Sequence, residues 1–153
     1  MSTPATTVAT DPRTAAVGDS LPEQHHEPTT VQIFRYSAAT SNTHRIHYDK
    51  DYAATEGYPG ILVQSHLHGA LVTRLLTDWT RPAGGRLTRL ALSIRRYAVP
   101  GDDLLCRATV TAIAEDDTGR TIELDVAEAR PADDAVCAPG TATVWVPLAG
   151  SAS

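Results

Sequence analysis

The hydrophobic positions follow one period in the middle of the chain and another in its second half. From Ile61 to Trp79 the sequence ILVQSHLHGALVTRLLTDW contains no helix breaker except Gly69, and its apolar residues cover more than one helical stripe. A helix that is apolar on most of its faces is typical of the interior of a domain. We therefore predict a long buried helix over this range.

The second half of the chain reads as strands. Ranges 90–97, 104–114, 121–129 and 140–147 have the alternation or composition of strands, and PGDD and EDDTG form turns between the first three. Strands joined by short turns favour an antiparallel meander. One long helix followed by such strands predicts an α+β domain in which an antiparallel sheet wraps the central helix.

The region before the long helix is less regular. The lead-in GDSLPEQHHEP predicts irregular structure, residues 29–39 a strand or a strand that runs into a helical turn, and residues 51–54 a short helix capped by Asp49. Residues 1–16 carry hardly any large apolar side chain, which indicates a flexible N-terminal tail. The expected domain covers residues 17–148, followed by a C-terminal tail at 149–153.

Composition narrows the class of protein. The 153 residues suit one domain, and the net charge of −5 argues against general nucleic-acid binding, which needs clustered basic residues. Cys106 and Cys137 show no CxxC spacing, so we expect buried free thiols. No secretory signal and no membrane-spanning run is found in the sequence, so we expect a cytoplasmic protein without a membrane partner.

The segment SNTHRIHYD, residues 41–49, gathers polar residues that suit either metal binding or proton transfer. His44 and His47 with Asp49, or His66 and His68, have spacings that a metal site can use. On a helix, however, His66 and His68 point about 200° apart, so we expect no metal.

His47 suits a general base, because imidazole titrates near neutral pH, and Asn42 can hold a water or carbonyl beside it. The plainer interpretation is a histidine that only bonds a turn. The buried helix that follows favours a site, because its first N–H groups face any oxyanion placed there. Polar residues on its first turns indicate the mouth of a pocket: Gln64, Ser65, His66 and His68.

The run FRYSAATSNTHRIHYDKDYAATEGYPGILVQSHLHGALVTRLL resembles the MaoC-like hydratases and dehydratases, especially hydroxyacyl-thioester dehydratase type 2 and the mesaconyl- or itaconyl-CoA hydratases. The resemblance covers roughly residues 17–147, including GDSLPE and RRYAVPGD. It implies a single hot-dog fold and a dimer with sites near the subunit interface. By resemblance to the wider MaoC family, His47 activates water together with an Asp five residues earlier. In this chain that position holds Asn42, and Asn there resembles the type 2 branch, so loss of activity need not follow.

The chain departs from the family pattern at two places. A carboxamide does not exchange a proton at neutral pH, so His47 alone would remove the α-proton and return it to the departing hydroxyl, with Asn42 as positioner. Ser65 stands where the family has a Gly whose N–H binds the thioester oxygen. Thr73 either orients Asn42 or bonds its own helix, and His66 is either a second acid/base or part of the dimer face.

We therefore expect a homodimeric hydratase or dehydratase that acts on an enoyl or 3-hydroxyacyl thioester of CoA or acyl carrier protein and needs no cofactor. The alternatives are a non-catalytic hot dog, such as the silent subunit of a heteromeric hydratase, and a thioesterase or cyclase. The expected residues are His47 and Asn42 for catalysis, and Ser65, Gln64, His66, Thr73 and Tyr58 for binding the oxyanion and substrate.

Overall fold

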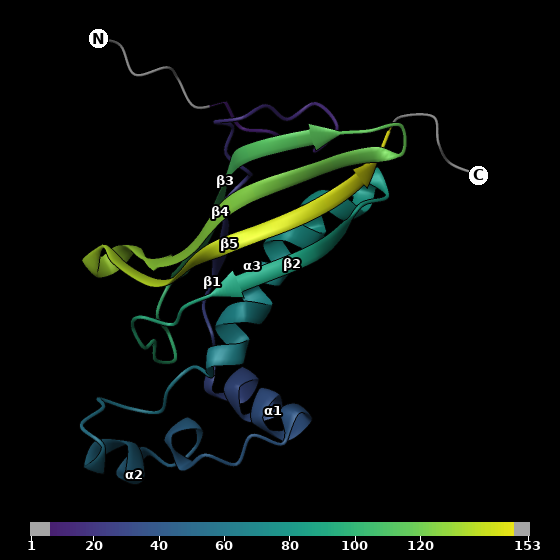
Figure 1. Cartoon of the computed structure of the whole chain (residues 1–153). Coiled ribbons are helices and arrows are strands. Elements are labelled where there is room, and N and C mark those ends of the chain that lie inside the picture. The colour runs from purple at the N-terminus through teal and green to yellow at the C-terminus, as the bar shows by residue number, and fades with distance from the viewer. Residues whose placement is uncertain (1–6, 149–153) are drawn as a thin grey trace.

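A five-stranded antiparallel sheet curls around helix α3 in this computed structural model, which describes residues 7–148 (Figure 1). The strand order is β1-β3-β4-β5-β2. The strands are β1 (Gln24–His26), β2 (Arg86–Leu92), β3 (Leu104–Glu115), β4 (Gly119–Arg130) and β5 (Ala135–Pro147). The helices are α1 (Thr30–Thr40), α2 (Lys50–Thr55) and α3 (Ser65–Thr80), with single 3₁₀ turns η1 (Arg45–His47), η2 (Arg81–Ala83) and η3 (Pro131–Asp133).

The core lies between α3 and the concave face of the sheet. Leu71, Leu75 and Leu76 of α3 are buried together with the inward residues of the strands, among them Leu124 and Val144. Each such side chain contributes about 1.5–3 kcal/mol when it is removed from water. The predicted α+β architecture, a buried helix wrapped by an antiparallel sheet, is confirmed. Strands β3, β4 and β5 form a meander, whereas β2, which was expected to begin it, pairs with β5 at the other edge.

The predicted helix begins later than expected, at Ser65 instead of Ile61. The four residues before it are extended, because their backbone pairs with other segments: Leu62 N bonds Ile46 O at 2.9 Å and Val63 N bonds Ala98 O at 2.9 Å. The first bond ties the loop that carries His47 to the chain entering α3, and the second ties that chain to the loop between β2 and β3.

The segment at residues 29–39 is helix α1, so the predicted strand is wrong. Thr29 caps the helix by accepting a hydrogen bond from Gln32 N at 3.1 Å, and the buried residues Ile33 and Ser37 lie one turn apart. The β-branched residues suggested a strand, but a cap and an i,i+4 buried pair decide the local structure. The lead-in contains the short strand β1, and strand pairing of β2 ends at Leu92 instead of continuing to residue 97.

The N-terminal residues also differ from the expectation. Ala9 and Ala15 are buried, and Trp79 Nε1 donates a hydrogen bond to the carbonyl of Ala9 at 2.8 Å. Residues 7–16 therefore pack on the domain and are not a free tail, because small side chains fill the surface beside Trp79. The remaining expected tail residues, 1–6 and 149–153, lie outside the described part of the chain.

The expectation for the two cysteines is tested by the packing. Cys106 and Cys137 are both free and buried, as predicted, and burial together with Glu128 raises the pKa of Cys106 to about 12. Within residues 7–148 no helix combines the length and apolarity needed to cross a membrane.

Candidate active site

His47 lies in η1, on the loop between α1 and α2, and only 7% of its surface is exposed. Its Nδ1 lies 2.9 Å from the carbonyl oxygen of Leu62. Because a carbonyl only accepts, Nδ1 carries the hydrogen and Nε2 carries the lone pair. The fold therefore fixes the tautomer in which Nε2 is free to take a proton.

The surroundings of His47 favour its neutral form. Burial lowers the pKa of His47 from its usual value, the bond to Leu62 opposes this, and the neighbouring His44 lowers the pKa further. A neutral imidazole at physiological pH is the form that a general base requires.

A pocket of about 360 Å³ opens at His47. Phe34 and Ile61 supply apolar walls, and Phe34 is 64% exposed although it is a large hydrophobic residue. The rim carries Lys50, the single lysine of the chain. The pocket thus joins a base, an apolar surface and one cation; its lining is Thr30, Phe34, His47, Tyr48, Lys50 and Ile61.

The loop around His47 is fixed by local hydrogen bonds. Asn42 accepts a bond from His44 N at 3.2 Å through Oδ1, so its amide NH₂ remains available. Asp49 caps α2 by accepting from Tyr52 N at 2.9 Å, as predicted, and pairs with Arg45 at 2.6 Å. The backbone that carries both histidines is thereby held from either end.

The first turn of α3 offers free donors. Gln64 is the N-cap residue, and its side chain makes no capping bond. Within the described chain the backbone N–H groups of Ser65 and His66 bond no acceptor. Such groups carry the positive end of the helix dipole and suit an oxyanion.

The side chain of Gln64 does not reach a pocket. It is fully buried and donates through Nε2 to Ile33 O and to Ser37 Oγ, both at 2.8 Å. Gln64 therefore holds the start of α3 against α1, while its position in the sequence suggested a residue at the pocket mouth.

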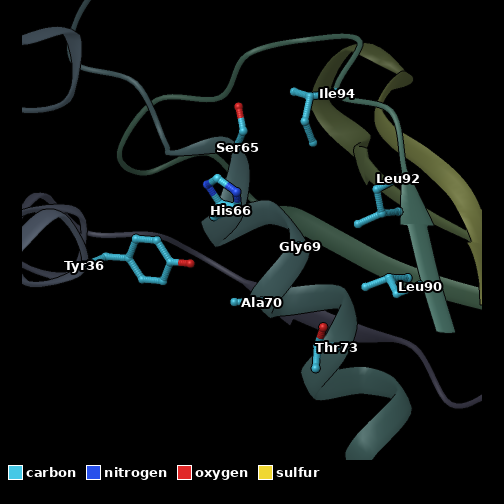
Figure 2. A pocket seen from close by; sticks show the side chains of 9 residues that line it. All are labelled: Tyr36, Ser65, His66, Gly69, Ala70, Thr73, Leu90, Leu92 and Ile94. Atoms are coloured by element: carbon cyan, nitrogen blue, oxygen red, sulfur yellow. The ribbon is translucent and has the colours of Figure 1, made fainter. Parts of the chain in front are cut away.

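A second pocket, of about 620 Å³, lies between α3, α1 and the edge strand β2 (Figure 2). Ser65, His66 and Thr73 enter it from α3, and the hydroxyl of Tyr36 points toward them from α1. Inside residues 7–148 these four side chains have no hydrogen-bond partner. The opposite wall is apolar and consists of Leu90, Leu92 and Ile94.

His68 faces the core instead of a pocket mouth. It is 1% exposed and its Nδ1 hydrogen-bonds the carboxylate of Glu128 on β4, which is 0% exposed. One feature of the sequence could have indicated Glu128: it occupies an inward-facing position of a strand whose hydrophobic and polar residues alternate.

The candidate residues thus fall into separate groups. His47 lines one pocket, while Ser65, His66 and Thr73 line another; neither lining includes Asn42 or Tyr58. Tyr58 packs edge-on against Tyr97, with ring centroids 5.3 Å apart. Among the described residues no group of His, Cys, Asp and Glu could hold a metal ion. Tyr36, Phe34 and Lys50 were not expected as pocket residues.

Comparison with solved structures defines the fold class. The (R)-hydratase from A. caviae involved in PHA biosynthesis superposes with a TM-score of 0.78 at 22% identity, over 88% of this chain and 99% of that one. The ChsH1-ChsH2 complex from Mycobacterium tuberculosis gives a TM-score of 0.74 at 24% identity, over 86% of this chain and 98% of that one. The protein therefore has the hot-dog fold of the MaoC-like dehydratases.

Sequence comparison defines the family. Residues 2–97 match hydroxyacyl-thioester dehydratase type 2, and the chain belongs to this family. Mesaconyl-C(4)-CoA hydratase from Chloroflexus aurantiacus is 54% identical over 55 residues, which are 35% of this chain and 18% of that protein. The chain thus matches less than one fifth of that relative's length.

Proposed function

We propose that the protein hydrates an enoyl thioester, or dehydrates the 3-hydroxyacyl thioester, with His47 as both base and acid. The observation that carries this proposal is the 2.9 Å contact from His47 Nδ1 to Leu62 O, which leaves Nε2 as the free base beside a pocket. Membership of a dehydratase family supports the reaction class.

The chemistry needs one proton acceptor and one site for negative charge. Nε2 of His47 takes the α-proton of the 3-hydroxyacyl thioester, and the negative charge that develops on the thioester oxygen meets the N–H groups of Ser65 and His66. The imidazolium then protonates the departing hydroxyl, so that water leaves and the double bond forms. No metal or redox cofactor is needed, because the thioester itself acidifies the α-carbon.

Asn42 and Thr73 would assist by hydrogen bonding. The NH₂ group of Asn42 remains available to hold the hydroxyl oxygen, since Oδ1 is already bonded to His44 N. Thr73 lies in the second pocket, where it can contact the substrate. Tyr58 and Gln64 would act indirectly, through Tyr97 and α1.

A second copy of the chain would complete the site. The base and the candidate oxyanion donors line separate pockets in one protomer, and β2 is an edge strand next to the larger pocket. A homodimer that pairs these faces would bring one protomer's base to the other's helix. The thioester is carried by CoA or acyl carrier protein.

The alternative is a non-catalytic subunit that binds thioesters in a heteromeric hydratase. Asn42, at the position where the wider MaoC family has an Asp, favours it. Purified protein is incubated with crotonyl-CoA and with a dicarboxylic enoyl-CoA, and the ultraviolet absorbance of the conjugated thioester is followed. Hydratase activity predicts loss of absorbance that His47→Ala abolishes. Absence of turnover by a folded protein that binds both thioesters would favour the silent subunit.

A further inference from the structure

We propose that His44 contacts the substrate as well, donating a hydrogen bond from Nε2–H to the oxygen that leaves or attacks at the β-carbon. This inference rests on the proposed function, in which His47 is the base. It assigns the two histidines of the loop different tasks: His47 moves the proton, and His44 holds the oxygen.

The tautomer of His44 is opposite to that of His47. His44 is the N-cap residue of η1, and its Nδ1 accepts a hydrogen bond from the backbone N–H of Ile46 at 3.3 Å. An imidazole nitrogen that accepts carries the lone pair, so in neutral His44 the hydrogen lies on Nε2. The loop thus presents an acceptor on His47 and a donor on His44.

The two rings are close enough to share one oxygen atom. Their centroids are 6.1 Å apart and the rings meet edge to face at 62°. Groups that both bond one oxygen at about 2.8 Å lie within about 5.6 Å of each other. A centroid separation of 6.1 Å permits the two Nε2 atoms to lie within that distance when the rims that carry them face each other.

The side chain of His44 is also held in place. Its ring lies edge-on to Tyr52 with centroids 6.2 Å apart, and the guanidinium of Arg45 covers the Tyr52 ring at 4.5 Å. Its backbone N–H is bound by Asn42 Oδ1 at 3.2 Å. His44 does not line the pocket at His47, but its side chain neighbours His47 and remains exposed, so its Nε2–H is accessible to a ligand.

The proton balance needs no change of charge on His44. During dehydration the α C–H bond breaks as His47 Nε2 takes the proton, and the electron pair moves onto the thioester oxygen as an enolate. The pair then returns to form the α–β double bond as the β C–O bond breaks, and the leaving hydroxide takes the proton from the His47 imidazolium and departs as water. His44 keeps its own hydrogen throughout and donates only a hydrogen bond to that oxygen.

Two variants separate this task from the capping task. Asn is a good N-cap residue, so His44→Asn keeps an acceptor for Ile46 N but lacks the ring donor, whereas His44→Ala loses both. We expect kcat to fall on the order of 10- to 100-fold in both variants, with KM little changed. His25→Asn, at an exposed histidine of β1 that pairs with Asp103 and makes no contact with His47, is the matched control and should keep wild-type kcat.

The outcomes distinguish this inference from the proposed function. A wild-type protein without turnover, or an active His47→Ala variant, would overturn the proposed function and this inference with it. Activity that is lost in His47→Ala but retained in His44→Asn would overturn the role of His44 alone. Nitrogen chemical shifts of labelled histidines give a readout independent of activity: we expect hydrogen on Nε2 of His44 and on Nδ1 of His47, and hydrogen on His44 Nδ1 would contradict the inference.

Discussion

The imidazole of His68, on α3, is hydrogen-bonded to the carboxylate of Glu128, on β4, in the interior of the fold. Nε2 of His68 and Oε2 of Glu128 are also buried, and neither has a further partner among the described residues. The pair therefore links the first half of the central helix to the centre of the sheet through a single polar contact.

Removing one member of this pair should destabilise the protein strongly. Glu128→Ala leaves an imidazole without its partner in a buried site, for which we expect a loss of about 3–5 kcal/mol in the free energy of unfolding. Urea denaturation measures it, and Glu123→Ala, on the exposed face of the same strand, should change stability by less than about 0.5 kcal/mol.

Replacing both members should be much less harmful than replacing one. A double variant, His68→Leu with Glu128→Met, removes both polar groups and keeps similar volume, so its stability should approach that of the wild type. If the double variant were as unstable as the sum of the single variants, the two residues would not be acting as a pair.

The pH dependence of turnover should follow His47. Because burial lowers the pKa of His47, the neutral base persists below the usual histidine value of about 6.5 and activity is lost only as the pH falls further. The profile of kcat/KM against pH therefore should show its acid limb below pH about 6.5. An acid limb well above that value would contradict a buried, neutral His47.

The proposed role of the Ser65 backbone N–H as an oxyanion donor can be tested by removing that hydrogen. Proline is well tolerated at the first position of a helix, and Gln64 already has the extended conformation, φ −66° and ψ 143°, that a residue before proline requires. Ser65→Pro should therefore fold normally and lose on the order of 100-fold or more in kcat. Ser65→Ala, which retains the N–H, is the control; equal activity in both variants would exclude this donor.

Introducing the acid of the wider MaoC family at position 42 should increase activity. Asp at this position can still accept the hydrogen bond from His44 N, and it adds a group that exchanges protons on the loop that carries His47. We expect kcat of Asn42→Asp to rise on the order of 10-fold. Asn42→Ala, which loses the turn, should be less active than the wild type; a drop in both variants would mean that the amide itself is required.

The architecture could be predicted from the sequence because the spacing of hydrophobic residues is defined by many positions together. The helix around Leu71 and Leu75 and the alternating strands each rest on several concordant positions. The strand predicted at residues 29–39 was wrong because the segment contains several β-branched residues, which favour a strand. The single residue that indicated a helix start was Thr29, the N-cap of α1. A short segment offers too few positions for its period to decide between strand and helix.

The sequence suggested which residues could form a site, and it did not indicate how they are arranged. The motif suggested His47 as the base, and the bond to Leu62, fifteen residues later, is what fixes its tautomer. The spacing of residues within a short motif does not reveal contacts with a segment further along the chain. For the same reason Gln64 and His68, which looked like pocket residues, bond α1 and Glu128 instead.

The bond between Trp79 and the carbonyl of Ala9 gives the protein an internal optical reporter. The chain has two tryptophans, and Trp79 is 6% exposed, whereas Trp145 lies partly exposed beneath the guanidinium of Arg86 at 4.3 Å. Detachment of residues 7–16 would expose the indole of Trp79 to water and shift its fluorescence emission to longer wavelength. The emission of Trp145 would not change. In a Trp145→Phe variant, the emission wavelength of Trp79 alone therefore reports whether the N-terminal segment is packed on the domain.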